Sequence, residues 1–248
     1  EALEASDGYK RKSLLMETHV VCQEKVKMKM LGLVIVDEQQ RFGVKQRFDL
    51  VKKSSNQIMP HQLFMTATPI PRTLAMTIFA DLDVSKIDEM PPGRKPVETL
   101  VFSDKKKNEI VKRLENVCSK GNQVFWLCTM IEESENLVVQ AAEEAKIWIK
   151  ENTSKLNIGL VHSKLSKDER DKAIEKFRSG KIDVLVCTTV MEVGMDVPNA
   201  SLIVIENAER LGLSQLHQLR GRVGRKADVD AFCVLIYQGE IGEIAKAR

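Results

Sequence analysis

The sequence lacks the features that mark membrane-spanning and metal-binding proteins. No apolar run approaches the roughly 20 residues that a membrane-spanning helix requires. The 4 histidines are scattered and the 5 cysteines show no metal-ligand spacing, so neither residue type predicts a metal centre. The chain opens without a charged-then-apolar leader of the secretory type. We therefore expect a cytoplasmic protein with no membrane partner.

Cysteine is scarce, and the odd number argues against a disulfide framework. Cys128, Cys187 and Cys233 fall within apolar runs, which predicts buried, reduced thiols. Net charge is also low, at +3, so the whole chain gives no argument for a polyanionic partner. Residues 41–53 are locally basic, and two interpretations stay open for them: a solvated helix face, or a surface for nucleic acid.

Short apolar segments alternate with longer helical patterns along the chain. The predicted strands are 31–36, 62–66, 97–102, 123–129, 157–161, 183–188, 201–206 and 231–237. Their nearly continuous Val, Ile and Leu content is typical of strands buried on both faces of a parallel sheet. Helices are predicted at 105–119, 134–151 and 166–179, the last opened by a capping box of Ser166 and Glu169 and ended by Gly180. The alternation predicts an α/β fold with flanking helices.

Residues 90–96 read Met-Pro-Pro-Gly-Arg-Lys-Pro and interrupt this alternation. Such a composition excludes a helix or a central strand. We predict a linker at 91–96, between a first domain, 1–90, and a second domain, 97–248. The first contains two good strands, too few for a complete α/β domain, and the chain begins at Glu1 rather than Met. We therefore expect a piece of a longer protein whose first domain is truncated.

Residues 215–225 read Gln-Leu-His-Gln-Leu-Arg-Gly-Arg-Val-Gly-Arg and predict a phosphate-binding segment. The guanidinium groups of Arg222 and Arg225 can grip phosphate with two parallel hydrogen bonds. A glycine before each arginine lets the backbone bend or approach a ligand closely. The alternative is a basic surface helix that holds both glycines, although each glycine costs a helix interior about 1 kcal/mol.

Polar residues follow three of the predicted strands. Asp37 and Glu38 end the first, where two acids can hold a Mg²⁺ shell and orient a water molecule. Thr66-Ala67-Thr68-Pro69 ends the second, and we expect its hydroxyls to hydrogen-bond the acidic pair. Thr188 to Asp196 follows a third, where threonines suit phosphate contacts with a nucleic-acid backbone. Taken singly, each segment is also typical of an ordinary turn or loop.

Taken in order, these four segments resemble motifs II, III, V and VI of superfamily 2 helicases and translocases. Further stretches are similar to the RecG-type helicases: residues 37–44, 66–73, 91–94, 131–135 and 205–210. The match covers nearly the whole chain. It implies RecA-like domains of the P-loop NTPase type, with ATP and Mg²⁺ bound between two of them.

The resemblance also implies roles for individual residues. Asp37 would serve Mg²⁺ and Glu38 would activate the attacking water. The γ-phosphate would contact Gln218, Arg222 and Arg225, and the nucleotide would face Gly194 and Asp196. Residues for DNA contact or for coupling hydrolysis to DNA movement would be Thr66, Thr68, Gln40, Thr188, Thr189 and Glu192.

The implied substrate is branched double-stranded DNA, at stalled replication forks and Holliday junctions, which such proteins remodel in recombination and repair. A single-stranded DNA-binding protein is expected as a further partner, and the implied location is the bacterial cytoplasm, at the nucleoid during activity.

The chain departs from the family pattern in several ways. No Gly-x-x-x-x-Gly-Lys-[Ser/Thr] loop occurs, so we expect this chain by itself not to hydrolyse ATP. From the resemblance we also expect the family's N-terminal DNA-binding wedge and C-terminal translocation segment to lie outside this chain. Gln40 stands where histidine is usual, and Glu17 where glycine is usual.

Two alternatives stay open at this point. One is a translocase like the transcription-repair coupling factor, which acts on stalled RNA polymerase. The other is a non-catalytic RecA-like module that binds nucleic acid or a partner without hydrolysis.

Overall fold

The computed structural model describes residues 31–39, 42–43, 46, 49–50, 59–67, 83–129, 135–188 and 197–239. The chain divides into two compact units, Glu1–Leu82 and Asp83–Arg248. The predicted linker, residues 91–96, lies within the second unit. Among the described residues, no helix is long and apolar enough to cross a lipid bilayer.

The first unit contains two parallel strands, β1 (Leu33–Val36) and β2 (His61–Phe64). Alternate side chains of β1 pack inward, where Val34 and Val36 form a small core with Leu50. Leu33 and Ile35 point the other way and are 53% and 54% exposed. Among the described residues of β1, one face is therefore buried and the other is exposed.

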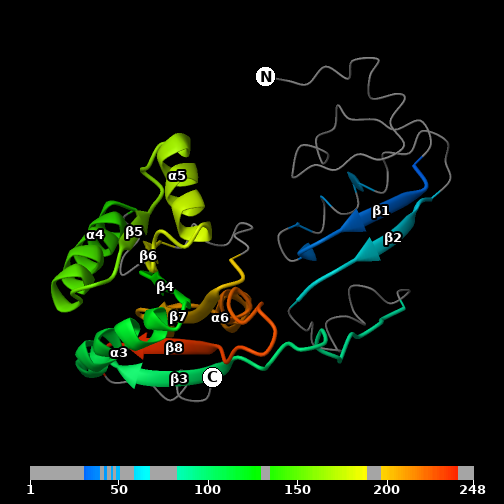
Figure 1. Cartoon of the computed structure of the whole chain (residues 1–248). Helices are drawn as coiled ribbons and strands as arrows, with labels where there is room; N and C mark the ends of the chain where they lie inside the picture. The colour runs from blue at the N-terminus through cyan, green and yellow to red at the C-terminus, as the bar shows by residue number, and fades with distance from the viewer. Residues whose placement is uncertain are drawn as a thin grey trace. The chain divides into compact units, whose positions relative to one another are not determined.

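The second unit contains a six-stranded parallel sheet in the order β3-β8-β7-β4-β6-β5 (Figure 1). The strands are β3 (Glu98–Ser103), β4 (Gln123–Leu127), β5 (Ile158–Val161), β6 (Val184–Cys187), β7 (Ala200–Ile205) and β8 (Phe232–Tyr237). All eight strands predicted from the sequence are present, with ends within about two residues of the predicted positions.

Helices cover both faces of this sheet, and each face has its own apolar core. The helices are α3 (Lys107–Ser119), α4 (Glu135–Asn152), α5 (Lys167–Arg178) and α6 (Leu213–Arg220), with short 3-10 turns at Asp104–Lys106 and Ala208–Arg210. The core beneath α3 and α4 includes Trp126, and the core beneath α5 and α6 includes Phe125. Successive residues of β4 thus point into opposite cores. Both faces of the strand are covered, so all of its residues are buried.

The three predicted helices are confirmed as α3, α4 and α5. The capping box at the start of α5 is present: the Glu169 N–H donates to Ser166 Oγ (3.3 Å), and the Ser166 N–H donates to the Glu169 carboxylate (3.0 Å). Gly180 follows α5 with a φ of 75°. In contrast, α6 was not among the helices predicted from the sequence.

The three cysteines predicted to be buried are buried, and they are free thiols. Cys187 lies in β6 and Cys233 in β8, while Cys128 follows β4. Burial raises the pKa of Cys233 to about 12 and raises the pKa values of Cys128 and Cys187 well above the ordinary value. In the folded state these thiols therefore stay protonated at alkaline pH.

This burial predicts a loss of stability at alkaline pH. Below about pH 9 the thiols are protonated in both states and have no effect. Above it the unfolded chain releases their protons and the folded chain does not, so the free energy of unfolding falls by about 1.4 kcal/mol per thiol and pH unit. Denaturant titrations between pH 8 and 10.5 measure this fall. The variant Cys187→Ala should show a shallower fall, and an equal slope in both proteins would contradict the account.

Candidate functional site

In the first unit, the parallel pairing of β1 and β2 places their carboxyl ends side by side. The Met65 N–H donates to Val36 O (2.8 Å), and the Gln39 N–H donates to Met65 O (3.1 Å). Asp37 and Glu38 therefore lie level with the segment that holds Met65 and Thr66. Hydrogen bonding of the Thr66 hydroxyl to the acids remains a prediction.

The backbone at the acidic pair has an unusual conformation. Glu38 has a φ of 50°, in the left-handed region, and its N–H donates to Asp37 Oδ1 (2.8 Å). Non-glycine residues rarely adopt this conformation, which costs about 1–3 kcal/mol and is often found at functional sites. The turn holds the exposed Asp37 and the half-buried Glu38 at the end of the strand.

This acidic pair fits Mg²⁺ of the kind that accompanies a nucleotide. Among the described residues no group of three or more His, Cys, Asp or Glu side chains gathers as a complete protein cage. Mg²⁺ does not require one, because it keeps several waters and is held by one or two carboxylates and the phosphates of its substrate. The exposed Asp37 carboxylate suits that mode of binding.

Sequence reasoning missed Gln39, which follows the acidic pair. It is 6% exposed, and its Oε1 atom has no hydrogen-bond partner among the described residues. The Phe42 N–H donates to the Gln39 backbone carbonyl (3.1 Å), so the chain turns back directly after the acids. Two coupling residues predicted nearby, Gln40 and Thr68, lie outside the described residues.

In the second unit, hydroxyl and charged side chains gather where strands end at the carboxyl edge of the sheet. Thr188 directly follows β6 and is buried, and its N–H donates to Val161 O (3.2 Å). Thr129 follows β4, and its hydroxyl donates to the backbone carbonyl of Glu206 (2.7 Å). The predicted contacts Thr189, Glu192, Gly194 and Asp196 lie outside the described residues.

A charged network that sequence reasoning missed stabilises this same edge. The Lys107 ammonium lies 2.8 Å from the Glu206 carboxylate and 4.6 Å from the centroid of the Trp148 ring. The Trp126 indole N–H donates to the same carboxylate. The charge on Glu206 is therefore paired and hydrogen-bonded, as a half-buried charge requires.

The arginine segment begins where α6 ends. Gln218 lies in the last turn of the helix, which ends at Arg220, and the Gly221 N–H donates to His217 O (3.1 Å). A single surface helix that holds both glycines is therefore excluded. Gly221 has an ordinary φ of −68°, so the expectation of special backbone freedom at each glycine is confirmed for Gly224 alone, which has a φ of 70°.

Gly224 fixes this segment against the amino edge of the sheet. Its N–H donates to Ala200 O (3.2 Å) at the start of β7. A Cβ atom on Gly224 would lie 2.8 Å from the Ala231 Cβ and 3.2 Å from Val97 Cγ2. Ala231 and Val97 directly precede β8 and β3, so three strand starts surround this glycine.

Both arginines therefore lie at the edge of the sheet opposite to Thr188. We call residues 221–230 the arginine loop; within it Arg222 is half-buried and Arg225 is exposed. The acidic pair and Thr188 lie at the carboxyl ends of strands, where ligands usually bind in α/β sheets, and the arginines do not.

Comparison with known proteins connects these features. The model of the helicase conserved C-terminal domain matches residues 100–227. The chain is 54% identical to the ATP-dependent DNA helicase RecG of Haemophilus influenzae over 241 residues, which cover 95% of this chain and 34% of that protein. It is 52% identical to RecG of Escherichia coli K12, with 95% and 34% coverage, and 48% identical to RecG of Thermotoga maritima, with 95% and 30% coverage. The chain thus spans about a third of the length of these relatives.

Solved structures confirm the predicted RecA-like fold. The structure of RecG bound to a three-way DNA junction superposes with a TM-score of 0.66 at 41% identity, covering 93% of this chain and 29% of that one. Yeast Dbp5 bound to RNA and ADP BeF3 superposes with a TM-score of 0.59 at 16% identity, covering 86% and 55%, a likeness of fold. The resemblance to RecG-type helicases that the motifs indicated is confirmed.

The environment of Gly224 predicts the effect of Gly224→Ala. The new methyl group would meet Ala231 in a backbone conformation that alanine disfavours. The matched control is Gly180→Ala, where φ is 75° but nothing lies within 4 Å of the added Cβ. Denaturant titration should show that Gly224→Ala lowers the free energy of unfolding by about 1–3 kcal/mol more than Gly180→Ala does. Equal losses would contradict the contact with the sheet edge.

Proposed function

Since this chain belongs to the family of the helicase conserved C-terminal domain, we propose that it is part of an ATP-dependent DNA helicase of the RecG type. The observation that carries this proposal is the 54% identity to a RecG helicase over 95% of the chain. The motif residues that the structure describes support it, because each lies within five residues of the end of a strand or helix.

In this function the two units contribute different groups to ATP hydrolysis. Mg²⁺ bound with the nucleotide would neutralise charge on the phosphate oxygens. Asp37 would hold that ion and Glu38 would orient the attacking water and accept its proton. Gln218, Arg222 and Arg225 would contact the γ-phosphate and stabilise the charge that develops during transfer.

Other predicted residues of the second unit would contact the nucleotide or the DNA. Gly194 and Asp196 are proposed to face the nucleotide, and Thr188, Thr189 and Glu192 to contact the DNA backbone. Thr188 directly follows β6, and the other four residues, which lie outside the described residues, are assigned from the motif resemblance. Thr66, Thr68 and Gln40 would couple hydrolysis to DNA movement.

The proposed substrate is branched double-stranded DNA, at stalled forks and Holliday junctions. The support is the structure of a RecG bound to a three-way DNA junction, to which this chain is 41% identical. Branch migration in the bacterial cytoplasm, in association with the nucleoid and with a single-stranded DNA-binding protein, completes the proposal.

The arginine assignment is tested in a protein that joins this chain to an upstream phosphate-binding loop. Arg225→Ala should lower kcat for DNA-stimulated ATP hydrolysis by about 10³-fold or more, because an arginine that contacts the transferred phosphoryl group acts in the transition state. Binding to a model fork, measured by fluorescence anisotropy, should change little. Turnover within about tenfold of the unchanged protein, equal to about 1.4 kcal/mol of barrier, would refute the assignment.

Two controls accompany this measurement. Arg178→Ala removes an exposed arginine at the end of α5, and it should leave turnover within about twofold of the unchanged protein. The 248-residue chain alone contains no Gly-x-x-x-x-Gly-Lys-[Ser/Thr] loop and should show no turnover.

A further inference from the structure

The segment predicted as a linker is a folded turn. The Arg94 N–H donates to Pro91 O (3.0 Å), which closes a four-residue turn with Pro92 at its second position. Gly93, at the third position, has a φ of 77°. This is the residue pattern of a type II turn, in which proline fixes one central residue and glycine accepts the positive φ of the other. We call residues 91–95 the proline turn.

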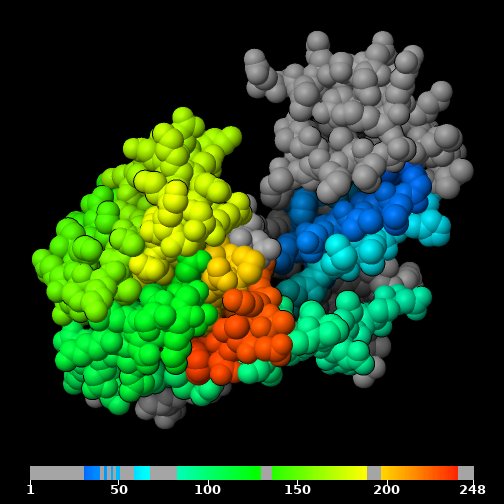
Figure 2. Space-filling view, viewed as in Figure 1, coloured from blue at the N-terminus to red at the C-terminus, as the bar shows by residue number. Residues whose placement is uncertain are grey.

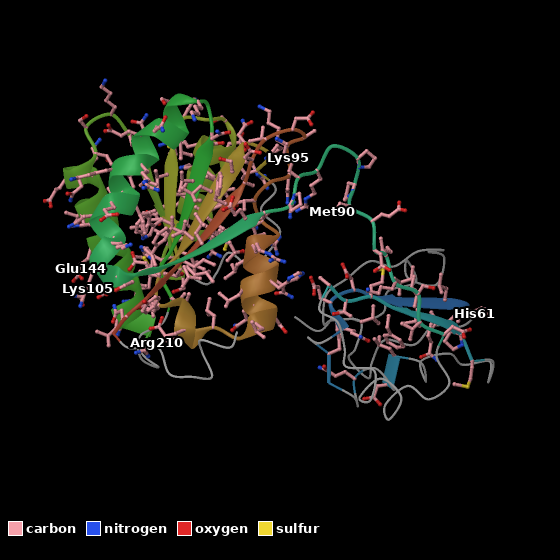
Figure 3. The ribbon with its side chains drawn as sticks, turned by 90° about the horizontal axis from the view of Figure 1, so that it is seen from below. His61, Met90, Lys95, Lys105, Glu144 and Arg210 are labelled. Carbon is pink, nitrogen blue, oxygen red and sulfur yellow. The ribbon has the colours of Figure 1, made fainter. Side chains whose placement is uncertain are left out.

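The proline turn is attached to the arginine loop by polar contacts. The Asp228 N–H donates to Gly93 O (3.0 Å), and Arg94 Nη2 donates to Gly221 O in a longer contact of 3.4 Å. Figure 2 shows the blue-green surface of the chain around the proline turn beside the orange-red surface of the chain after α6. Figure 3 labels Met90 and Lys95, which lie on either side of residues 91–94.

The proline turn and the arginine loop are also in close van der Waals contact at Gly93. A Cβ atom on Gly93 would lie 3.0 Å from the Cβ of Ala227. Ala227 is two residues beyond Arg225, so the turn contacts the loop close to the exposed arginine. Any displacement of the turn toward the loop would therefore move the backbone that carries this side chain.

Arg94 occupies a position that suits a fixed cation. Gly221, whose carbonyl it contacts, caps the C-terminal end of α6, where backbone carbonyls lack partners within the helix and the helix dipole is negative. The Arg94 side chain is half-buried, and its Nε atom is buried without a hydrogen-bond partner among the described residues. By contrast, the neighbouring ion pair of Lys95 and Asp230 (2.9 Å) has side chains that are 46% and 73% exposed.

The arginine loop is thus held from two sides. The sheet fixes it through the Gly224 N–H and Ala200 O, and the proline turn fixes it through Gly93 and Arg94. Arg222 directly follows Gly221, whose carbonyl contacts Arg94. Residues 83–90, which carry the chain from the first unit into the proline turn, are exposed along their whole length.

We propose that Arg94 is a positioning residue that holds the arginine loop in the geometry required for ATP hydrolysis. The proposal rests on the proposed function, because it takes Arg222 and Arg225 as the groups that contact the γ-phosphate. The proline turn then has a role beyond joining two domains. It contacts and supports the loop that carries Arg222 and Arg225.

This role predicts a specific kinetic change. A misplaced arginine loses an interaction made in the transition state, so kcat falls while KM for ATP stays nearly constant. A shift of about 1 Å in a catalytic group can cost about 100-fold. Arg94→Met keeps a long unbranched side chain and removes the charged donor. We expect it to lower kcat by about 10- to 100-fold, with KM within about threefold.

The kcat of Arg94→Lys should lie between those of the unchanged protein and Arg94→Met, about two- to tenfold below the unchanged protein. Lysine keeps the positive charge but lacks the planar fork of arginine. Lys95→Ala, in the same turn, is the matched control: exposed ion pairs contribute little, so its kcat and KM should stay within about twofold. These rates are measured by DNA-stimulated ATP hydrolysis in the protein that joins this chain to an upstream phosphate-binding loop.

Amide hydrogen exchange gives a readout that does not depend on activity. In Arg94→Met the amides of Gly221, Arg222 and Gly224 should exchange faster, while those of the central strand β4 stay unchanged. Unchanged exchange in the arginine loop, or a kcat within twofold of the unchanged protein, would overturn the proposal. If Arg94→Met does not fold, Arg94→Lys is decisive, and unaltered kcat and exchange in that variant overturn the proposal equally.

Failure of this proposal is distinct from failure of the proposed function. If Arg225→Ala stops hydrolysis and Arg94→Met does not slow it, the positioning role is wrong and the function stands. If Arg225→Ala still hydrolyses ATP, the arginine assignment itself is wrong, and with it the positioning of those arginines for hydrolysis.

Discussion

The hydrogen bond from the Gly224 N–H to Ala200 O, at the start of β7, fixes the backbone that carries Arg222 and Arg225 in the second unit. It joins the loop after α6 to the amino edge of the six-stranded sheet, where β3, β7 and β8 begin. The site tolerates no side chain, because neighbouring Ala231 and Val97 occupy the space that a Cβ would need. This packing fixes the backbone that carries the arginines. Without it, charged side chains on a surface loop would not be held in one position.

The second unit therefore presents different chemistry at its two edges. Thr188 lies at the carboxyl edge and the arginines lie at the amino edge, a strand length apart, which for a strand of six residues such as β7 is about 20 Å. In the proposed function the DNA and the nucleotide would contact opposite edges of one rigid sheet. Such an arrangement suits a motor. If the unit rotates when its arginines engage the nucleotide, the residues that contact DNA at the opposite edge of the rigid sheet move with it.

Much of this architecture could be predicted because the strands are buried on both faces and so form continuous apolar runs, and because Ser166 and Glu169 mark the start of α5. The acidic pair was placed correctly, since parallel strands bring their carboxyl ends together. The edge occupied by the arginines was not predicted, because α6 is short and its direction depends on how its own Leu219, and Val223 just beyond it, pack into the core beneath the sheet. The contact of Arg94 with Gly221 spans 127 positions in the chain, and no local pattern encodes such a partner.

The central claim is that carboxylates from the first unit and guanidinium groups from the second act on one triphosphate. A crystal structure of this chain joined to an upstream phosphate-binding loop, trapped with a non-hydrolysable ATP analogue and Mg²⁺, tests it most directly. The account predicts that the Glu38 carboxylate and the Arg225 guanidinium both lie within about 4 Å of the γ-phosphate or its attacking water. An analogue that contacts neither group, with Glu38 and Arg225 on separate surfaces, would contradict it.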